Sequence, residues 1–232
     1  MERQYRKLEV LPDTLLGCRF FDRLERAERA HITRYCEGRG YRAGAEIIRH
    51  RDNSRDVYFI LAGRVQASLL TDAGKIVIFQ ELAHGEMFGE LSAIDAAPRS
   101  TSVIAIEETS VVRMSGPNFK DLVARIPSLA EQTMLRLCAL SRFLCERAFE
   151  SRAFTVPDQV RLEVCRIIAS YPPQDGPLVI DPAPTHEEIA RRVGTTREQV
   201  TRVMSDFAKQ GLIEQSRKRW TIHDTAAVCA DL

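Results

Sequence analysis

The sequence contains none of the features that mark membrane or secreted proteins. No stretch approaches the roughly 18 consecutive apolar residues that a membrane-spanning helix needs. The N-terminal stretch from Met1 to Lys7 is rich in charge and has no apolar segment of the kind that signal peptides carry. We therefore expect a protein that stays in the cytoplasm and has no membrane partner.

The sequence also lacks the spacing of a metal or redox motif. Its six cysteines form no Cys-x-x-Cys pair, which excludes the usual patterns of zinc, thioredoxin-like and clustered iron–sulfur sites. Several have apolar neighbours, where a free cysteine packs as a small hydrophobic side chain. We expect all of them to be reduced structural thiols. The cysteines are Cys18, Cys36, Cys138, Cys145, Cys165 and Cys229.

Signs of catalysis are missing as well. The sequence shows no nucleophile–base pair, no metal-ligand spacing and no phosphate-binding loop. Its 232 residues allow one large or two modest domains and leave no room for a separate catalytic domain. We predict that the protein is not an enzyme, and an enzyme with a regulatory β-roll is a remote alternative.

The chain as a whole has no large excess of either charge, but one segment is rich in positive charge. The net charge is +1, yet the segment from Arg191 to Arg219 has eight Lys or Arg and three Asp or Glu. Such a cluster is more often a solvated face than a nucleic-acid contact, so by itself it is weak evidence.

The secondary-structure signals change along the chain. Residues 8–40 show helical spacing in places, whereas residues 41–115 contain short β-prone runs separated by turn residues. Many short strands with glycine turns predict a closed β-roll or barrel. A helix is expected to begin near Gly116, and a longer one after Pro127. The β-prone runs are 46–48, 57–61, 65–70, 76–79, 101–106 and 110–114, and the glycines of the turns are Gly44, Gly63, Gly74 and Gly85.

The longer helix, residues 128–151, has apolar residues on more than one face. One stripe follows the alternating 4-3 spacing of a coiled coil, and a second apolar set lies on other faces. A surface helix needs one apolar stripe, so two favour packing against its own domain and against a second copy. A single wide core face is the alternative. The stripe is Ala130, Met134, Leu137, Ser141, Leu144, Ala148 and Ser151, and the second set includes Leu129, Leu135, Cys138, Leu140 and Phe143.

A hinge is expected at residues 152–154, just before a helix start. Thr155 is the expected N-cap, Asp158 lies at the N3 position, and Pro157 is tolerated in the first turn. We expect this helix to extend to about Tyr171 and a short strand to follow at residues 178–180.

Two capped helices follow with a short turn between them. Thr185 and Glu188 form the capping box of the first helix, and Gly194 ends it. Thr196 caps the second helix, with Gln199 at N3. This arrangement is typical of a helix-turn-helix, although helix pairs of this size are common.

The outward side chains of the second helix favour base reading. Arg can donate two hydrogen bonds to guanine, and Glu can accept from cytosine. A pair between Glu198 and Arg202 on a solvated helix is the alternative interpretation. The outward residues are Arg197, Glu198, Thr201 and Arg202, the inward ones are Val200, Val203, Met204 and Phe207, and the basic turn of a predicted phosphate-contacting wing contains Arg217, Lys218 and Arg219.

Residues 185–222 resemble the DNA-binding domain of the cyclic-AMP receptor/fumarate–nitrate regulator (Crp/Fnr) family. Arg197-Glu198 and Arg202 match its Arg-Glu-x-x-x-Arg recognition set. The resemblance implies a transcription regulator that binds double-stranded DNA as a homodimer, at palindromic half-sites containing TGTGA or a near variant, with RNA polymerase as a further partner. The DNA contacts that it implies are Thr185, Thr196, Arg197, Glu198, Thr201, Arg202, Arg217, Lys218 and Arg219.

The most specific motif lies upstream, at residues 88–101, and reads Phe-Gly-Glu-Leu-Ser-Ala-Ile-Asp-Ala-Ala-Pro-Arg-Ser-Thr. A cyclic nucleotide presents a ribose hydroxyl and a single negative phosphate. Glu90 can accept from the hydroxyl, and Arg99 with Ser100 can donate to the phosphate oxygens. Gly89 permits a close approach between backbone and ligand. A structural ion pair between Glu90 and Arg99 is the alternative.

This motif resembles the phosphate-binding cassette of cyclic-nucleotide-binding domains. Together the two resemblances cover nearly the whole chain. They imply an α+β fold, with a jelly-roll-like cyclic-nucleotide-binding β-roll over residues 1–117, linking and dimerisation helices over 118–152, and a winged helix-turn-helix over 153–232. Cyclic AMP is the implied effector, and no metal is implied. The implied ligand contacts in the cassette are Gly89, Glu90, Leu91, Arg99, Ser100 and Thr101.

Two departures from the family pattern concern a turn and the purine. Where the family has a glycine in an early turn, we expect Asp52-Asn53 to form the turn. Near the Thr-Ser pair that contacts adenine in the cyclic-AMP receptor, this chain has Cys145-Glu146. If Glu146 faces the pocket, its carboxylate suits the N–H donors of guanine, which makes cyclic GMP the second candidate effector. Otherwise Cys145, or Ser141 one turn earlier, contacts adenine.

Another signal on the same fold is the main alternative. The oxygen-sensing branch uses a cysteine cluster that Cys18 and Cys36 alone do not supply. Haem ligation by His31, His50 or His84 would make the protein a gas or redox sensor. A regulator of this fold that has lost its effector is a further alternative.

Overall fold

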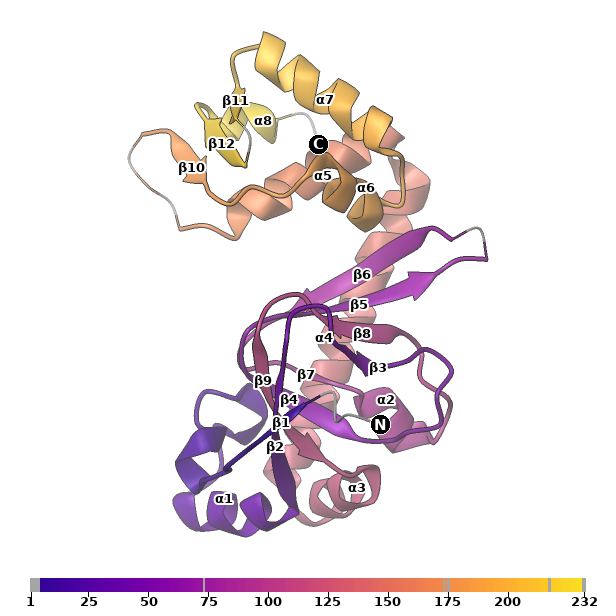
Figure 1. The fold of residues 1–232 in the computed structure, drawn as a ribbon, viewed down its shortest axis with the longest axis vertical. Helices are drawn as coiled ribbons and strands as arrows, with labels where there is room; N and C mark the ends of the chain where they lie inside the picture. Colours follow the sequence, from indigo (N-terminus) through magenta and orange to yellow (C-terminus); the bar gives the residue numbers. More distant parts are fainter. Residues whose placement is uncertain (1–4, 73, 173, 175, 217, 231–232) are drawn as a thin grey trace. The chain divides into compact units, whose positions relative to one another are not determined.

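The computed structural model describes residues 5–72, 74–172, 174, 176–216 and 218–230. It divides into two compact units, Met1–Leu69 with Phe79–Arg142 and Leu70–Ile78 with Phe143–Leu232. Figure 1 shows the elements of both units. Among the described residues, no helix is long and apolar enough to cross a membrane.

A β-roll forms the centre of the first unit, as predicted (Figure 1). Within the described residues, one sheet has the strand order β1-β2-β9-β4-β7 and the other β3-β8-β5-β6. The strands are β1 (Arg6–Leu8), β2 (Cys36–Tyr41), β3 (Glu46–Ile48), β4 (Val57–Ala62), β5 (Val65–Leu70), β6 (Ile76–Leu82), β7 (Met87–Phe88), β8 (Ser102–Ala105) and β9 (Thr109–Met114).

Strand β2 was not predicted, because its sequence Cys-Glu-Gly-Arg-Gly-Tyr has little β propensity. Its backbone pairs antiparallel with β1 on one side and β9 on the other. Gly38 permits the approach of β1, since a Cβ there would lie 2.6 Å from the carbonyl oxygen of Leu8. Pairing on both sides therefore overrides the weak local preference.

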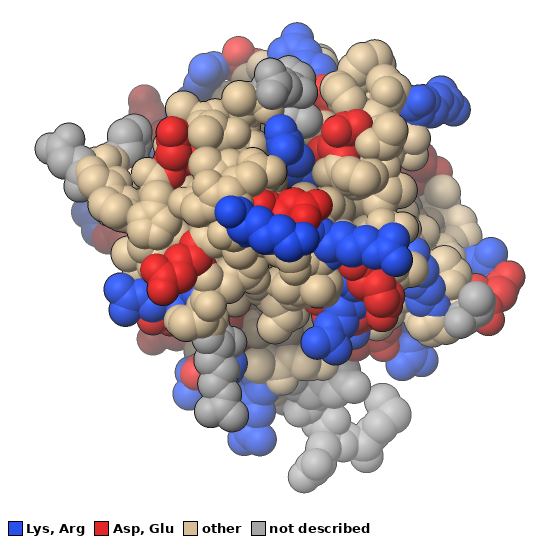
Figure 2. All heavy atoms as spheres, turned by 90° about the horizontal axis from the view of Figure 1, so that it is seen from above, with Lys and Arg blue, Asp and Glu red and all other residues tan. Residues whose placement is uncertain are grey.

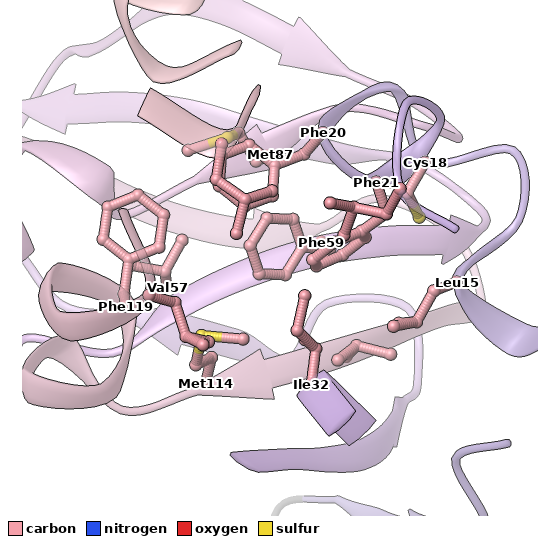
Figure 3. Packing of buried hydrophobic residues seen from close by; sticks show 14 of the residues in the cluster. Leu15, Cys18, Phe20, Phe21, Ile32, Val57, Phe59, Met87, Met114 and Phe119 are labelled. Atoms are coloured by element: carbon pink, nitrogen blue, oxygen red, sulfur yellow. The ribbon is translucent and has the colours of Figure 1, made fainter. Parts of the chain in front are cut away.

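Aromatic side chains from distant parts of the chain form the core of this unit (Figure 3). The ring centroids of Phe21 and Phe59 lie 4.6 Å apart, and those of Phe20 and Phe119 lie 5.6 Å apart. These four side chains are at most 5% exposed. Burial of each contributes about 1.5–3 kcal/mol, so the cluster holds the N-terminal helical turns and α3 against the roll.

The helices of this unit agree in part with the predictions. Ser115 caps α3 by accepting a hydrogen bond from the Asn118 amide at 3.4 Å, so that helix begins at Gly116 as predicted. Helix α2 within the cassette was not predicted. The helices are α1 (Arg26–Ile32), α2 (Glu90–Asp95), α3 (Gly116–Arg125) and α4 (Pro127–Ala153), with 3-10 turns at Pro12–Leu15, Arg19–Phe21 and Thr33–Tyr35.

Helix α4 leaves large apolar side chains at the surface. Leu129 and Thr133 are its buried residues, and of the second predicted set Leu135 is 50% exposed. In the predicted stripe, Met134 is 59% and Leu144 46% exposed. The helix therefore packs on the roll near its start and exposes single large apolar side chains further along.

The second unit contains a winged arrangement of helices and strands. Its sheet has the order β10-β12-β11, and α5, α6 and α7 pack together. Ile189, Val200, Met204 and Phe207 are at most 1% exposed in its core. The elements are α5 (Val156–Ala169), β10 (Leu178–Ile180), α6 (His186–Val193), α7 (Arg197–Lys209), β11 (Ile213–Ser216), β12 (Arg219–Ile222) and α8 (Thr225–Val228).

A buried carboxylate in α5 joins three elements of this unit. Glu163, with 6% of its side chain exposed, lies 3.4 Å from Arg147 of α4, 3.3 Å from Arg166 of α5 and 3.5 Å from Arg192 of α6. Glu150 of α4 also pairs with both Arg147 and Arg166. A carboxylate this buried is stabilised when positively charged groups surround it, as the three arginines do here.

The bounds predicted for the hinge, residues 152–154, differ from the break that the structure shows. Helix α4 continues to Ala153, and α5 begins at Val156 after the predicted capping box of Thr155 and Asp158. The break is therefore Phe154–Thr155, and the carbonyl of Phe154 accepts a hydrogen bond from Gln159 Nε2 at 2.9 Å. Helix α5 ends at Ala169, slightly before the predicted end.

The turn predicted at Asp52-Asn53 also differs. The residue with the left-handed backbone is Arg51, with φ of +63°. Its amide donates to the carbonyl of Arg99 at 3.0 Å, and the Arg99 amide donates to the carbonyl of Asp52 at 2.9 Å. These backbone bonds to a distant segment fix the turn, which explains why local composition misplaced it.

The prediction that all cysteines are free is wrong. Cys165 of α5 and Cys229, directly after α8, form a disulfide with a Cα–Cα distance of 5.7 Å. Cys18, Cys36, Cys138 and Cys145 are free. The sequence could not reveal the pair, because 64 positions separate its members and folding alone brings them together.

Candidate functional sites

The cassette begins with a glycine that no other residue could replace without strain. Gly89 has φ of +86°, and a Cβ there would lie 2.6 Å from the carbonyl oxygen of Asp56. This left-handed residue turns the chain from β7 into α2 and places Glu90 at the first position of that helix.

Glu90 is buried against an arginine from α4. Its side chain is 4% exposed, and Oε1 lies 3.4 Å from Nε of Arg136. Burial raises the pKa of Glu90, and the positive charge of Arg136 partly opposes that shift. The Nε–H of Arg136 is buried and, among the described residues, has an ion-pair partner but no hydrogen bond of good geometry. A polar group in this condition can bond a ligand.

Arg99 is also buried, but it does not use its guanidinium to pair with Glu90. It donates to the carbonyl of Gly89 at 2.9 Å, to the carbonyl of Asp56 at 2.7 Å and to the hydroxyl of Ser54 at 3.1 Å. Burial lowers the pKa of Arg99 from its usual value. A guanidinium has five N–H donors, so these three bonds fix its position and leave donors for an anion.

The cassette therefore gathers one buried carboxylate, one buried guanidinium and one half-buried guanidinium in the first unit. Around them Leu91 and Thr101 are half-buried, and Ser100 is exposed. Such a set can hold an anion beside a hydroxyl group. Arg136 was missed by sequence reasoning, although an arginine between Leu135 and Leu137 was a usable signal.

The candidates for purine contact lie further along α4. Ser141, Cys145 and Glu146 are all exposed in this single chain. Their contact with the purine stays a prediction.

In the second unit, α6 and α7 have the predicted caps. The Thr185 hydroxyl accepts from the Glu188 amide at 3.2 Å, and Thr196 accepts from the Gln199 amide at 3.4 Å. Gly194, with φ of +80°, ends α6. These local bonds fix where α7 begins, so its first turn is presented at the surface.

The four outward residues of α7 are exposed, as expected. Thr201 donates its hydroxyl to the carbonyl of Arg197 at 2.9 Å. Glu198 accepts hydrogen bonds from its own backbone amide and from Thr196, and these bonds lower its pKa. A negative side chain at this helix start is stabilised by the helix dipole and remains ionised beside the arginines.

His186 connects the two helices with the wing and was missed by sequence reasoning. Its Nδ1 lies 2.9 Å from Oγ1 of Thr201, and its Nε2 lies 2.9 Å from Oε1 of Gln215 in β11. Gln215 in turn donates through Nε2 to the carbonyl of Met204 at 3.2 Å. This chain of polar contacts fixes α6, α7 and β11 relative to one another.

A cavity of about 400 Å³ opens beside His186. It brings together predicted DNA contacts from α6, α7 and the wing, with two cations on its wall. Its lining includes Thr185, His186, Arg197, Ser216, Lys218 and Trp220. Glu187 also lines it, and the cations Arg197 and Lys218 offer positive charge to a phosphate group of a nucleic-acid backbone.

The wing carries exposed cations at Lys218 and Arg219. Arg217 lies outside the described residues. Figure 2, the view from above, shows Lys and Arg side chains with Asp and Glu between them.

Comparison with known proteins bears on both sites. Residues 39–126 match the model of the cyclic nucleotide-binding domain, and residues 140–230 match that of the Crp-like helix-turn-helix domain. The chain belongs to the Crp/Fnr family of transcription regulators. Members of this family are regulators and not enzymes, which agrees with the absence of catalytic motifs in the sequence.

Relatives support the same assignment across most of the chain. The "CRP-like cAMP-activated global transcriptional regulator" of Mycobacterium tuberculosis is 27% identical over 217 residues, covering 93% of this chain and 96% of that protein. The "cAMP-activated global transcriptional regulator Vfr" of Pseudomonas aeruginosa is 29% identical over 199 residues, covering 82% and 91%.

Among solved structures, the c-di-GMP responsive global regulator CLP of Xanthomonas campestris has a TM-score of 0.71. It is 18% identical and covers 86% of this chain and 100% of that chain. This likeness confirms the fold.

Proposed function

We propose that this Crp/Fnr regulator binds a palindromic DNA operator as a homodimer under the control of a cyclic purine nucleotide. The observation that carries the proposal is the set of buried Glu90, buried Arg99 and half-buried Arg136. Buried charges are costly and need partners, and here one guanidinium retains donors for an anion while another has a buried N–H without a hydrogen bond.

In the proposed complex, the nucleotide completes this set. The Glu90 carboxylate accepts a hydrogen bond from the ribose hydroxyl, and Arg99 neutralises the cyclic phosphate. Arg136 lies within ion-pair distance of Glu90, so it holds the carboxylate in place and adds positive charge near the phosphate. Gly89, Leu91, Ser100 and Thr101 line the cassette.

Cyclic AMP is the first candidate effector, and cyclic GMP is the second. The M. tuberculosis and P. aeruginosa relatives are named as cAMP-activated. The choice depends on Ser141, Cys145 and Glu146, because the carboxylate of Glu146 would suit guanine, whereas Ser141 or Cys145 would contact adenine.

The exposed apolar stripe of α4 supports the homodimer. Met134 and Leu144 are exposed at coiled-coil spacing, and a second copy would cover them. We propose residues 1–117 as the sensor domain, 118–152 as the linking and dimerisation helices, and 153–232 as the DNA-binding domain.

On DNA, α7 would enter the major groove. Arg197, Glu198 and Arg202 would read base edges of TGTGA-like half-sites, with Thr201 on the same exposed face. The phosphate contacts would come from Thr185, Thr196, Arg217, Lys218 and Arg219. RNA polymerase is the proposed further partner, and the cytoplasm is the proposed site of action.

Control would operate as a shift between conformations of the dimer. A nucleotide held by Glu90 and Arg99 beside Arg136 favours one arrangement of the paired α4 helices. That arrangement places the two copies of α7 about 34 Å apart, one turn of DNA.

The test is a calorimetric titration of the protein with cyclic AMP and cyclic GMP, followed by operator titration with each nucleotide and with none. We expect one nucleotide to bind and to tighten operator binding over random DNA. Absence of binding by both nucleotides would contradict the sensor half of the proposal. Equal affinity for operator and random DNA would contradict the regulator half.

A further inference from the structure

The Cys165–Cys229 disulfide joins α5 to the segment that follows α8 in the second unit. Cys165 is in the middle of α5, and Cys229 follows α8 near the end of the described chain. The bond fixes the C-terminal segment to a helix that also contacts α6 and α7. Its presence or absence therefore bears on the elements that support the recognition helix.

Three further contacts show how the C-terminal segment is held. Val228 is fully buried, and Asp224 caps α8 by accepting from the Ala227 amide at 2.8 Å. Arg161 of α5 donates to the carbonyl of Ala230 at 3.1 Å, and its guanidinium lies 5.4 Å from the ring centroid of Phe207 in α7. One side chain of α5 thus contacts both the C-terminal segment and the inner face of α7.

The solvent access of the bonded pair lies between that of buried Cys18 and that of exposed Cys138. Cys165 and Cys229 are both half-buried. Burial raises the pKa of Cys18 to about 11 and that of Cys36 to about 12, which keeps those two thiols protonated and unreactive. The partial exposure of Cys165 and Cys229 gives a small thiol in solution access to this pair.

We propose that Cys165 and Cys229 form a reversible thiol–disulfide site that reacts with a low-molecular-weight thiol couple and adjusts DNA affinity. The inference rests on the proposed function, because a protein that binds chromosomal DNA works where thiols are kept reduced. A disulfide in such a compartment is more often redox-sensing than structural. The half-buried position of the pair permits exchange.

The oxidation step is an exchange with glutathione disulfide. The thiolate of one cysteine attacks a sulfur of glutathione disulfide, which forms a mixed disulfide and releases one glutathione thiolate. The second cysteine thiolate then attacks the protein sulfur of the mixed disulfide and releases the second glutathione. In total, two protein thiols are oxidised and one glutathione disulfide is reduced to two glutathione thiols.

The bonded form holds α8 on α5 and so restricts local opening beneath α7. In the reduced form, the segment keeps the burial of Val228, the Arg161 hydrogen bond to the Ala230 carbonyl and the packing of α8 on α5, but loses the covalent link. Local opening costs less free energy where fewer contacts resist it, so we expect operator affinity to fall about three- to tenfold on reduction.

The experiment uses the full chain with Cys138→Ser, which removes an exposed free thiol, and keeps Cys145 because it is a candidate nucleotide contact. This protein is equilibrated with mixtures of glutathione and glutathione disulfide. The state of the pair is read by alkylation and peptide mass mapping, and operator affinity by fluorescence anisotropy. Thermal unfolding of the same samples gives a measure that does not depend on DNA.

We expect the pair to titrate between both states without denaturant, and operator affinity to follow the bonded fraction. Addition of Cys165→Ser and Cys229→Ser should fix the affinity at the reduced value in every mixture. The proposal is overturned if the pair stays reduced in pure glutathione disulfide, or stays bonded in excess dithiothreitol. It is also overturned if the two states bind the operator equally.

The outcomes separate this inference from the proposed function. If the serine variant binds the operator and affinity does not respond to glutathione, the regulator stands and the switch fails. If no state binds DNA, the regulator proposal fails and the switch in affinity fails with it, whereas alkylation still shows whether the pair exchanges.

Discussion

Half-buried Arg136 of α4 and buried Glu90 of α2 form an ion pair, with Nε and Oε1 3.4 Å apart. Arg136→Ala should leave the Glu90 carboxylate without its nearest cation, which lowers the free energy of unfolding by about 1–3 kcal/mol. It should also weaken nucleotide binding, because the cassette carboxylate loses its support.

Calorimetry and denaturant unfolding measure these two effects of Arg136→Ala. Arg142→Ala, which removes an exposed arginine of the same helix, is the matched control and should leave both quantities near wild type. Nucleotide affinity that is equal in the two variants would remove Arg136 from the site.

Burial raises the pKa of Glu90, so the folded protein holds this proton more tightly than the unfolded chain does. The resulting stabilisation is fully present below the unfolded-state pKa and is lost as the pH rises through the folded-state pKa. Glu90→Gln cannot ionise, so without nucleotide it should gain stability over wild type as the pH increases from about 4 to about 8. Denaturant unfolding across this range measures the difference, and Glu9→Gln at an exposed position is the control. A difference that does not change with pH would contradict the prediction.

If α7 reads base edges directly, replacing Arg197 and replacing Lys218 should have different effects on DNA binding. Arg197→Ala should cost about 1–3 kcal/mol on the operator and relax sequence preference, because it removes a base contact. Lys218→Ala should lower the affinity for operator and random DNA by a similar factor, because it removes a phosphate contact. It should also reduce the slope of log affinity against log salt concentration by about one. Titrations of operator and random DNA at several salt concentrations separate the two. Equal losses on both DNAs for Arg197→Ala would show that this residue does not read bases.

We expect His186 to position α7 for DNA binding. His186→Ala removes the contacts with Thr201 and Gln215, and we expect it to weaken operator binding by about 1–2 kcal/mol. His186→Gln retains a donor and an acceptor and should recover part of the loss. Anisotropy titration measures both variants, with His223→Ala at an exposed histidine as the control. Wild-type affinity in His186→Ala would rule out the positioning role.

If the exposed apolar stripe of α4 forms the dimer interface, one charge introduced into the stripe should dissociate the dimer. Leu144→Glu places a carboxylate in the exposed apolar stripe, and burial of that charge against a second copy would be costly. Ala139→Glu adds the same charge at an exposed position outside the stripe and should leave the dimer intact. Light scattering on a sizing column measures the mass of each. Dissociation by both, or by neither, would contradict the predicted interface.

The parts of the structure that the sequence predicted depend on neighbours along the chain. The caps at Thr185 and Thr196 and the start of α7 follow from side chains three residues away, so their composition was informative. The exposed face of α7 follows from helical spacing once the core residues are recognised. The cassette was predicted because its motif lies in one short segment.

The parts that were missed depend on residues far apart in the sequence. Strand β2 forms because β1 and β9 pair with it, and the turn at Arg51 is fixed by Arg99. Arg136 joins the cassette, and Cys229 reaches Cys165, through folding alone. His186 was passed over because its role depends on Gln215 of the wing.

The buried Glu163 has a mechanical consequence for signal transmission. Its partners include Arg147 of α4, and Glu150 of α4 pairs with Arg166 of α5, so ion pairs span the break at Phe154–Thr155. Rotation at that break would separate buried charges from their partners, which is costly. The last turns of α4 therefore move together with α5. A rotation of the end of α4 would be transmitted to α5 and, through its packing, to α7.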